Sequence, residues 1–280
     1  MEAITLARLR KIAGRSEQEL DLAEAALLIA AEEYPDLDVA GYLRRLDELA
    51  EGLRGKLPEK PDLEHAVAAL NRFMFEEQGF SGDTENYYDP RNSFLNEVLD
   101  RRRGVPITLS IIYMEIGWRL GLPLEGVSFP GHFLVKLATA EGDVVLDPFH
   151  GGVPLSEEDL RERLDETYSD LRGLNAPLER LLAASGKKEI LVRMLRNLKL
   201  IYLREQEPTK ALTVLDRILV VRPDLPEELR DRAQVYERLE CYRAAAEDYQ
   251  RYLALAPTAD DAQDIHGHLV ELRRVVSRMN

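Results

Sequence analysis

The first eighty residues carry apolar side chains at intervals of three and four, the spacing that lines them up along one face of an α-helix. Pro35 and the glycine- and proline-containing segment 52–62 interrupt this pattern and divide it into three predicted helices. Ser16 and Glu19 have the spacing of a capping box, which predicts the start of the first helix. We therefore expect an N-terminal helical region over residues 1–80, packed on the core that follows.

A different pattern follows in residues 81–184, where a polar loop precedes two helices and then short strands. Asn92 or Ser93 can cap the first of these helices, and Pro106 suits the opening position of the second, where no backbone amide is needed. The second helix, 106–120, is apolar around most of its circumference, which predicts a buried central position. Strands rich in valine, leucine and phenylalanine are predicted at 125–129, 132–138 and 143–146. A helix followed by an antiparallel meander predicts an α+β core.

From residue 185 onward the apolar pattern is helical again, and it repeats. Pro223 and Pro257 lie 34 residues apart, which is the period of the tetratricopeptide repeat (TPR). Four more pairs share this offset: Leu195 with Leu229, Tyr202 with Tyr236, Ala211 with Ala245 and Leu219 with Leu253. We predict two repeats, over 190–223 and 224–257, and a final helix that covers the open end. Residues 185–280 are thus assigned to an all-α TPR region.

The net charge of the chain and the length of its apolar segments limit the kinds of partner that we expect. The 280 residues include 51 acidic and 37 basic side chains, a formal charge of −14, whereas phosphate binding needs a basic surface. We therefore expect neither a nucleic acid nor a membrane as partner. The apolar run nearest the N-terminus, 25–31, is too short to span a membrane and lies between acidic residues, unlike a signal peptide, so we expect a cytoplasmic protein.

The cysteine and histidine content limits the candidate metal and redox chemistry. The single cysteine, Cys241, can form neither an internal disulfide nor a multi-cysteine zinc site. It lies inside the second predicted repeat, where we expect a small buried hydrophobic side chain rather than a nucleophile. His150, His266 and His268 are metal ligands by type, but residues two positions apart on a helix point to different faces. We expect no metal and no cofactor.

Candidate chemistry lies around the predicted central helix and strands. His132 opens one predicted strand and Asp147 closes the next, and adjacent antiparallel strands can place two such residues side by side. An aspartate that accepts a hydrogen bond from one imidazole nitrogen fixes the tautomer and orientation of the ring, as in nucleophile–His–Asp enzymes. A nucleophile at the helix start, 105–108, would gain from the positive end of the helix dipole. This is the frame of a Cys-His-Asp enzyme.

The segment resembles the transglutaminase-like core. That family has Gly-x-Cys at a helix start, Gly-Ile-Pro at its end, then a histidine and an Asp-Pro pair. Here Gly121–Pro123 takes the place of Gly-Ile-Pro, and His132 and Asp147–Pro148 fall on the histidine and the acid. Gly104–Pro106 falls on Gly-x-Cys, so Pro106 stands where the resemblance places the nucleophilic cysteine.

The chain is also similar to the bacterial SirB-type family, in which a transglutaminase-like domain precedes TPRs. The matching stretches are 30–39, 87–122, 129–137 and 146–152, together with the TPR region. The resemblance implies a papain-like α+β fold with an all-α extension. Proteins of this type are often described as regulatory, and the resemblance implies no settled activity.

Two functional hypotheses follow, and they differ in whether the chain has a nucleophile. Loss of a triad nucleophile costs on the order of 10⁶-fold in turnover, so Pro106 favours a non-catalytic scaffold or regulator that binds a protein or peptide through its TPRs. The alternative is a protease- or amidase-like hydrolase or acyl transferase that uses His132 and Asp147 with a water or hydroxyl nucleophile. The candidate hydroxyls belong to Ser93, Thr108 and Ser110. This alternative predicts a hydroxyl or water within about 3 Å of the His132 ring.

Several polar and aromatic side chains precede and open the central helix. These are Tyr88, Asn92, Ser93, Asn96 and Thr108. They form either turns and caps or the lip of a cleft above His132. The pair of His132 and Asp147 likewise has three interpretations: a support for two strand ends, the floor of a ligand or peptide cleft, or a residual catalytic dyad. The identity of a partner and the oligomeric state stay open.

Overall fold

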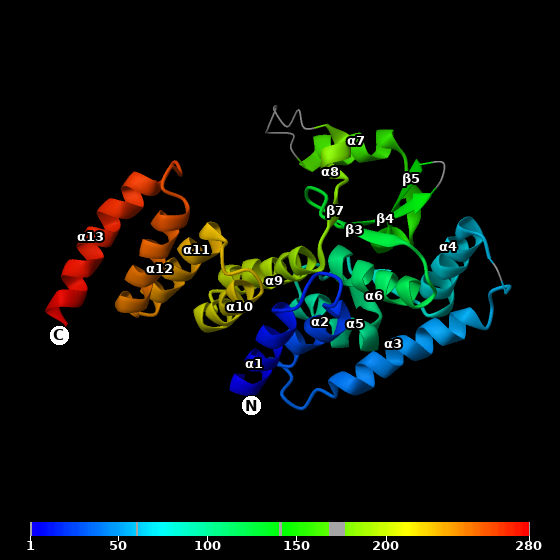
Figure 1. Cartoon of the computed structure of the whole chain (residues 1–280), viewed down its shortest axis with the longest axis horizontal. Coiled ribbons are helices and arrows are strands. Elements are labelled where there is room, and N and C mark those ends of the chain that lie inside the picture. The colour runs from blue at the N-terminus through cyan, green and yellow to red at the C-terminus, as the bar shows by residue number, and fades with distance from the viewer. Residues whose placement is uncertain (1, 60, 140–141, 168–176, 280) are drawn as a thin grey trace. The chain divides into compact units, whose positions relative to one another are not determined.

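The computed structural model describes residues 2–59, 61–139, 142–167 and 177–279 (Figure 1). The chain divides into two compact units, Met1–Met194 and Leu195–Asn280. The first unit combines helices with a small antiparallel sheet, and the described residues of the second are helical with short connections. This is the predicted combination of an α+β core and an all-α region. None of the described helices has the length and apolar character needed to cross a membrane.

Helices form the N-terminal part of the first unit. They are α1 (Glu2–Ala13), α2 (Leu22–Ala30), α3 (Val39–Arg54), α4 (Leu63–Asn71) and the π-helix η1 (Arg72–Glu77). Helices α2, α3 and α4 each follow an aspartate whose carboxylate accepts a hydrogen bond from the backbone amide three residues later. Ser16 and Glu19 bond to each other in a separate turn. The prediction that they start the helix is wrong, because Asp21 is the residue that caps α2.

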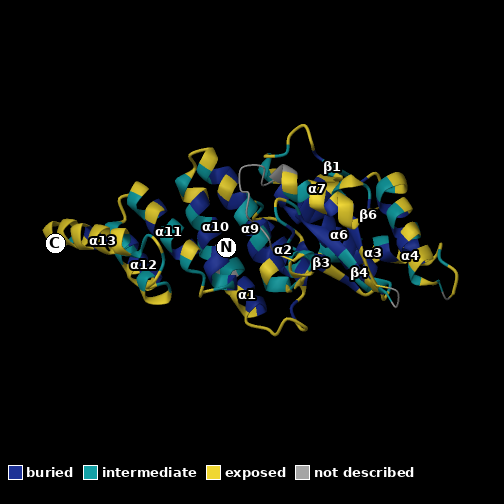
Figure 2. Cartoon of the chain, turned by 90° about the horizontal axis from the view of Figure 1, so that it is seen from above, coloured by how far each residue is buried: buried dark blue, intermediate teal, exposed yellow. Residues whose placement is uncertain are grey.

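Helix α6 (Pro106–Arg119) is the buried centre of the first unit, as its apolar sequence predicts. Every residue from Pro106 to Gly117 is buried, and Figure 2 shows this helix in dark blue. Pro106 takes the first helical position, where the missing amide costs no hydrogen bond. Gly117 has no side chain to hold Leu124 away, so the sheet packs closely against the helix.

A 3₁₀-helix, η2 (Pro90–Ser93), and α5 (Leu95–Arg101) precede α6. Phe94 takes the N-cap position of α5 and provides no side-chain cap, so the prediction that Asn92 or Ser93 caps this helix is wrong. The Asn92 side chain is occupied elsewhere, because its amide donates to the Asn86 carbonyl and to Asp83.

Antiparallel strands form a five-stranded sheet in the order β6-β5-β4-β3-β7. They are β3 (Leu124–Val127), β4 (Leu134–Thr139), β5 (Gly142–Asp147), β6 (Val153–Leu155) and β7 (Ala184–Ser185). The meander β3–β4–β5 confirms the three predicted strands to within two residues at each end. Strands β6 and β7 have three and two residues, too few to show a periodic pattern in the sequence. A separate parallel pair joins β1 (Ser81–Gly82) to β2 (Arg103–Gly104).

Helices cover both faces of this sheet. Helices α7 (Glu157–Thr167) and α8 (Leu178–Leu181) lie on one face and α6 on the other (Figure 1). Leu134 of β4, Val145 of β5 and Leu160 of α7 belong to one buried cluster. Because β4 and β5 are antiparallel, the start of β4 and the end of β5 lie at the same edge of the layer.

The second unit is a stack of helices, the first of which begins in the first unit. They are α9 (Lys187–Arg204), α10 (Pro208–Val221), α11 (Pro226–Arg238), α12 (Tyr242–Leu255) and α13 (Ala262–Arg278). The pairs α9–α10 and α11–α12 follow the two predicted repeats. Leu269 and Leu272 of α13 pack with Ala233, Ala245 and Tyr249 of the preceding helix pair. The rest of α13 is mostly exposed (Figure 2).

Cys241 is exposed, so the prediction of a buried side chain is wrong. It occupies the N-cap position of α12, in the turn that follows α11, and its thiol lies 3.5 Å from the Leu239 carbonyl oxygen. The repeat period assigned Cys241 to the second repeat but did not locate this turn, where side chains face solvent.

Candidate functional site

The structure places His132 and Asp147 side by side at one edge of the sheet. Asp147 is the last residue of β5, and His132 lies two residues before β4 instead of opening it. The His132 Nε2 atom is 2.9 Å from Asp147 Oδ1. The antiparallel pairing of β4 with β5 therefore has the effect expected from the sequence, which is to join a histidine and an acid from different strands.

Tight turns present both side chains. Gly131 has a φ of 69°, a left-handed conformation that suits glycine, and the His132 amide donates to the Phe129 carbonyl at 3.1 Å. Asp147 caps a short 3₁₀-helix, η3 (Pro148–His150), and accepts from the Phe149 amide. In a 3₁₀-helix, residues three apart lie on the same side, so this turn brings His150 over the Asp147 carboxylate.

The Asp147 carboxylate is fully buried and is bonded on both oxygens. Oδ1 is bonded to His132 and to the Phe149 amide, whereas His150 Nδ1 is 2.7 Å and Arg163 Nη1 2.6 Å from Oδ2. Burial alone would raise the pKa of Asp147, but the hydrogen bonds from the two histidines and the charge of Arg163 outweigh it and hold this pKa well below its usual range. The Asp147 carboxylate is therefore ionised, and its partners hold it in one orientation.

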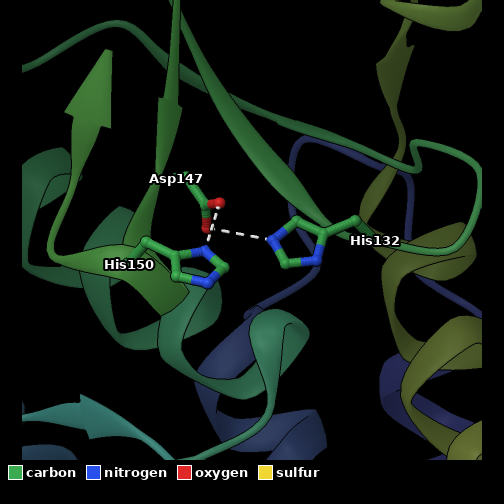
Figure 3. A group of neighbouring side chains, drawn as sticks. All are labelled: His132, Asp147 and His150. Carbon is green, nitrogen blue, oxygen red and sulfur yellow. Dashed lines mark hydrogen bonds and ion pairs between the residues drawn. The ribbon is translucent and has the colours of Figure 1, made fainter. Parts of the chain in front are cut away.

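Figure 3 shows the two imidazole rings on either side of the Asp147 carboxylate. The rings of His132 and His150 are stacked, with centroids 5.9 Å apart and planes 22° apart. Phe149 packs edge-on against both rings, and Gly82 leaves the space that the Phe149 ring fills. The His132 side chain is 15% exposed and that of His150 is 51% exposed, so solvent reaches this cluster from the side of His150.

Sequence reasoning did not place His150 or Arg163 in this site. The spacing of Asp147 and His150 was a usable signal, since a proline after the aspartate followed by glycines favours a short turn that aligns residues three apart. Arg163 gave no signal, because it is one of several charged residues on α7. The packing of α7 on the sheet is what brings it to Asp147.

No thiol or hydroxyl stands at the expected nucleophile position. Pro106 occupies the first turn of α6. The Thr108 hydroxyl is buried and donates to the Asn92 and Val105 carbonyl oxygens. The Ser93 and Ser110 hydroxyls are also fully buried, and neither has a hydrogen-bond partner among the residues that the structure describes. Within the described part of the chain, no hydroxyl lies within hydrogen-bond distance of the His132 ring.

The residues considered for a cleft are mostly interior. Tyr88 is 59% exposed, whereas the other four side chains are buried. Those four are Asn92, Ser93, Asn96 and Thr108. Turn and cap chemistry describes Asn92, which ties the loop before α5 together, and Thr108, which bonds the start of α6. Side chains that solvent does not reach cannot line an open cleft.

Three side chains of this site are also of the metal-ligating type. His132, Asp147 and His150 each offer one ligand atom, and these atoms lie within 4.8 Å of one another. By contrast, His266 and His268 are both exposed, and His268 is paired with Glu237 at 2.8 Å. Of these three histidines, only His150 belongs to a group of three possible ligands within the described residues.

Comparisons with known proteins agree with this architecture. The profile of the transglutaminase-like superfamily matches residues 40–196, and a tetratricopeptide repeat profile matches residues 198–269. A UPF0162 protein of Xylella fastidiosa (strain Temecula1) is 42% identical over 272 residues, which cover 97% of each chain. The UPF0162 protein PA3419 of Pseudomonas aeruginosa is 37% identical, over 92% of this chain and 93% of its own. SirB1 of Salmonella typhimurium is 29% identical, over 80% and 81% of the two chains.

Proposed function

Since the chain belongs to the transglutaminase-like superfamily, in the group of TPR-bearing proteins that includes UPF0162 and SirB1, we propose that it is a non-catalytic scaffold or regulator that binds a protein or peptide through its TPR region. The observation that carries this proposal is a proline, Pro106, at the first position of α6, where the resemblance to the transglutaminase-like core places the nucleophile. A proline side chain can neither attack a carbonyl carbon nor be activated by a base.

The surrounding hydroxyls do not replace the missing thiol. Thr108 would have to give up two hydrogen bonds to backbone carbonyls, and it has no imidazole within hydrogen-bond distance. Ser93 and Ser110 are sealed from solvent, so a substrate could not reach them without local unfolding. These observations support a domain that has kept its fold without its covalent chemistry.

In a binding protein, the cluster around Asp147 supports the architecture. One carboxylate ties together the start of β4, the turn η3 and helix α7 through His132, His150 and Arg163. A fully buried carboxylate with this many donors is costly to remove, because the donors lose their partner in a poorly solvated place. A structural role is therefore enough to explain why the cluster is so completely bonded.

The TPR region supplies the surface for a partner. Repeats of this kind bind other proteins on the faces that stacking leaves open. Among the described residues, five of the eight exposed large apolar side chains lie in the second unit, which is less than a third of the chain. They are Leu200, Leu255, Val270, Val275 and Met279. Exposed apolar side chains of this type are candidate anchors for a protein partner.

The first test measures catalysis. The purified full-length protein is assayed on a panel of peptide amides, glutamine-containing peptides and esters, beside the His132→Ala variant. We expect no turnover above that of the variant. Turnover of any substrate in the panel that is lost in both His132→Ala and Asp147→Asn would refute the non-catalytic proposal.

The second test measures binding. The full-length chain is chemically cross-linked in an extract of its own cells, and the proteins that it captures are identified. The captured proteins are then compared between the wild type and two matched variants. Val270→Glu/Val275→Glu alters exposed valines of α13, and Val153→Glu alters a similarly exposed valine of β6. We expect captured proteins to be lost only in the α13 variant. Equal capture by both variants would count against this face of the TPR region.

A second candidate function is hydrolysis by an activated water. It rests on the ordered imidazole of His132, whose Nε2 is held by Asp147 while Nδ1 has no hydrogen-bond partner in the described part of the chain. Such a ring can remove a proton from water. This function requires the same dyad-dependent turnover that the non-catalytic proposal excludes, so the activity panel separates the two.

A further inference from the structure

We propose that His132, Asp147 and His150 bind one divalent transition-metal ion. Each residue offers a ligand atom, and the three atoms lie within 4.8 Å of one another. The proposal does not depend on a catalytic role, because it concerns binding alone. It revises the expectation of a metal-free chain, which rested on the histidines of the last helix.

The spacing of the ligand atoms is close to that of a metal site. In a tetrahedral zinc site with bonds of about 2.0–2.1 Å, neighbouring ligand atoms are about 3.3 Å apart. Here His132 Nε2 and His150 Nδ1 are 2.9 and 2.7 Å from the two Asp147 oxygens. The two imidazole nitrogens are within 4.8 Å of each other, so side-chain movements on the order of an ångström convert this hydrogen-bonded arrangement into a metal-binding one.

The ligand types select the class of ion. Two imidazoles and one carboxylate suit Zn²⁺ and neighbouring divalent transition metals, whereas Ca²⁺ and Mg²⁺ prefer sites made of oxygen ligands. Three protein ligands leave at least one coordination position for water or a ligand. The 51% exposure of the His150 side chain gives an ion a route from solvent.

The residues around the three ligands supply the support that metal sites need. Arg163 and the Phe149 amide bond to the Asp147 carboxylate and hold its orientation. When a metal takes the imidazole lone pairs, the carboxylate loses its bonds to the two rings but keeps these two partners. Bonds of this kind to a ligating carboxylate typically change metal affinity by about 10–100-fold. The Phe149 ring, packed edge-on against both imidazoles, limits their rotation.

Arg163 is also the main argument against the site, since its charge competes with a cation for Asp147 Oδ2. The competition is limited in two ways. Asp147 has a second oxygen, Oδ1, whose partners among the described residues are His132 and the Phe149 amide. In addition, imidazoles bind a metal in their neutral form. In the part of the chain that the structure describes, the charges next to the three ligand atoms are then those of Asp147 and Arg163, and they cancel.

To test this, metals are first removed from the full-length protein with a chelator. The protein is then titrated with Zn²⁺ at neutral pH, and isothermal titration calorimetry measures the binding. We expect one equivalent of Zn²⁺ to bind. Replacing His150 by alanine removes one of the three ligands and should weaken binding by at least about tenfold. His150→Asn keeps a hydrogen-bond donor toward Asp147 but removes the imidazole, so it should bind as weakly as His150→Ala.

The double variant His266→Ala/His268→Ala is the control, because it removes the same kind of side chain from exposed positions on α13. We expect it to bind Zn²⁺ like the wild type. The absence of stoichiometric binding, or equal affinity in wild type and His150→Ala, would overturn the proposal. Loss of binding in the α13 variant would overturn it as well, because the ion would then sit elsewhere. A Co²⁺ absorption band that disappears in His150→Asn would support it independently.

Discussion

Buried carboxylates occur in both units of the molecule, but their partners differ in kind. In the second unit, Glu228 is bonded to a guanidinium and an ammonium group, those of Arg196 and Lys199, at 2.7 Å each. In the first unit, Asp147 is bonded to two imidazoles as well as to Arg163. Imidazoles change protonation near neutral pH and donate lone pairs to metals.

Accessibility is similar in the two networks. The Lys199 side chain is 9% exposed but that of Arg196 is 40% exposed, so solvent reaches one of the two ion pairs of Glu228. The His150 side chain is half exposed. The chemical type of the exposed partner is therefore what differs, because an imidazole that meets solvent can also donate a lone pair to a metal. The comparison thus separates a structural network from a candidate site, although both are built around a buried acid.

The largest effect is expected at Asp147. Replacing it by alanine leaves the Arg163 charge and two imidazoles without their shared partner, at a cost of about 3–5 kcal/mol in the free energy of unfolding. Urea denaturation at neutral pH measures it. The matched control is Asp143→Ala at the opposite end of β5, where a half-exposed acid pairs with Lys136 and about 0–1 kcal/mol is expected. If both substitutions lowered the free energy of unfolding equally, the buried network of Asp147 would contribute no more than a surface ion pair.

A smaller effect is expected at Glu228. The substitution Glu228→Gln removes a charged acceptor, but Lys199 keeps Asp231 as a second partner at 2.7 Å. We expect a loss of about 1.5–3 kcal/mol, measured by the same denaturation method. Because this network has no imidazole, addition of Zn²⁺ should leave the difference between wild type and variant unchanged. If Zn²⁺ changed the difference in unfolding free energy between wild type and Glu228→Gln, the Glu228 network would not be purely structural.

The pH dependence of stability tests the charge state of Asp147. Its pKa is lowered in the folded protein, so the stabilisation is fully present above the unfolded-state pKa of about 3.9 and is lost as the pH falls toward the folded-state value. We expect the difference in unfolding free energy between wild type and Asp147→Asn to be constant above about pH 5 and to shrink at lower pH. A difference that grows on acidification would mean that the carboxylate is protonated in the folded state.

The sequence predicts features that depend on neighbouring or regularly spaced residues better than contacts between residues far apart in the chain. The continuous apolar run of α6 and the 34-residue repeat are local or periodic, and both were sufficient to place their elements. The adjacency of His132 and Asp147 followed from antiparallel pairing of two predicted strands. Arg163 could not be foreseen, because its contact with Asp147 depends on how α7 packs against the sheet.

Other misses have equally specific physical causes. Ser16 and Glu19 do form the bonds of a capping box, but within a single turn, and Asp21 is the acceptor nearest the start of α2. Cys241 was expected to be buried because it lies inside the second predicted repeat, near Leu239 and Tyr242. A chain that reverses between two helices exposes such a residue even inside a repeat. Turns and caps are decided by one or two residues, which periodicity does not resolve.

The smallest effect on the metal-free fold, and the sharpest test of the comparison, is expected for His150→Ala. A half-exposed histidine on a carboxylate that keeps three other donors should contribute only about 0.5–1.5 kcal/mol to unfolding. Zn²⁺ at one hundred times its dissociation constant should stabilise the wild type by about 2.7 kcal/mol. The variant should gain much less, so the effect of one substitution becomes larger when the ion is present. Thermal unfolding with and without Zn²⁺ measures this, and an equal shift in both proteins would make His150 a structural residue like those around Glu228.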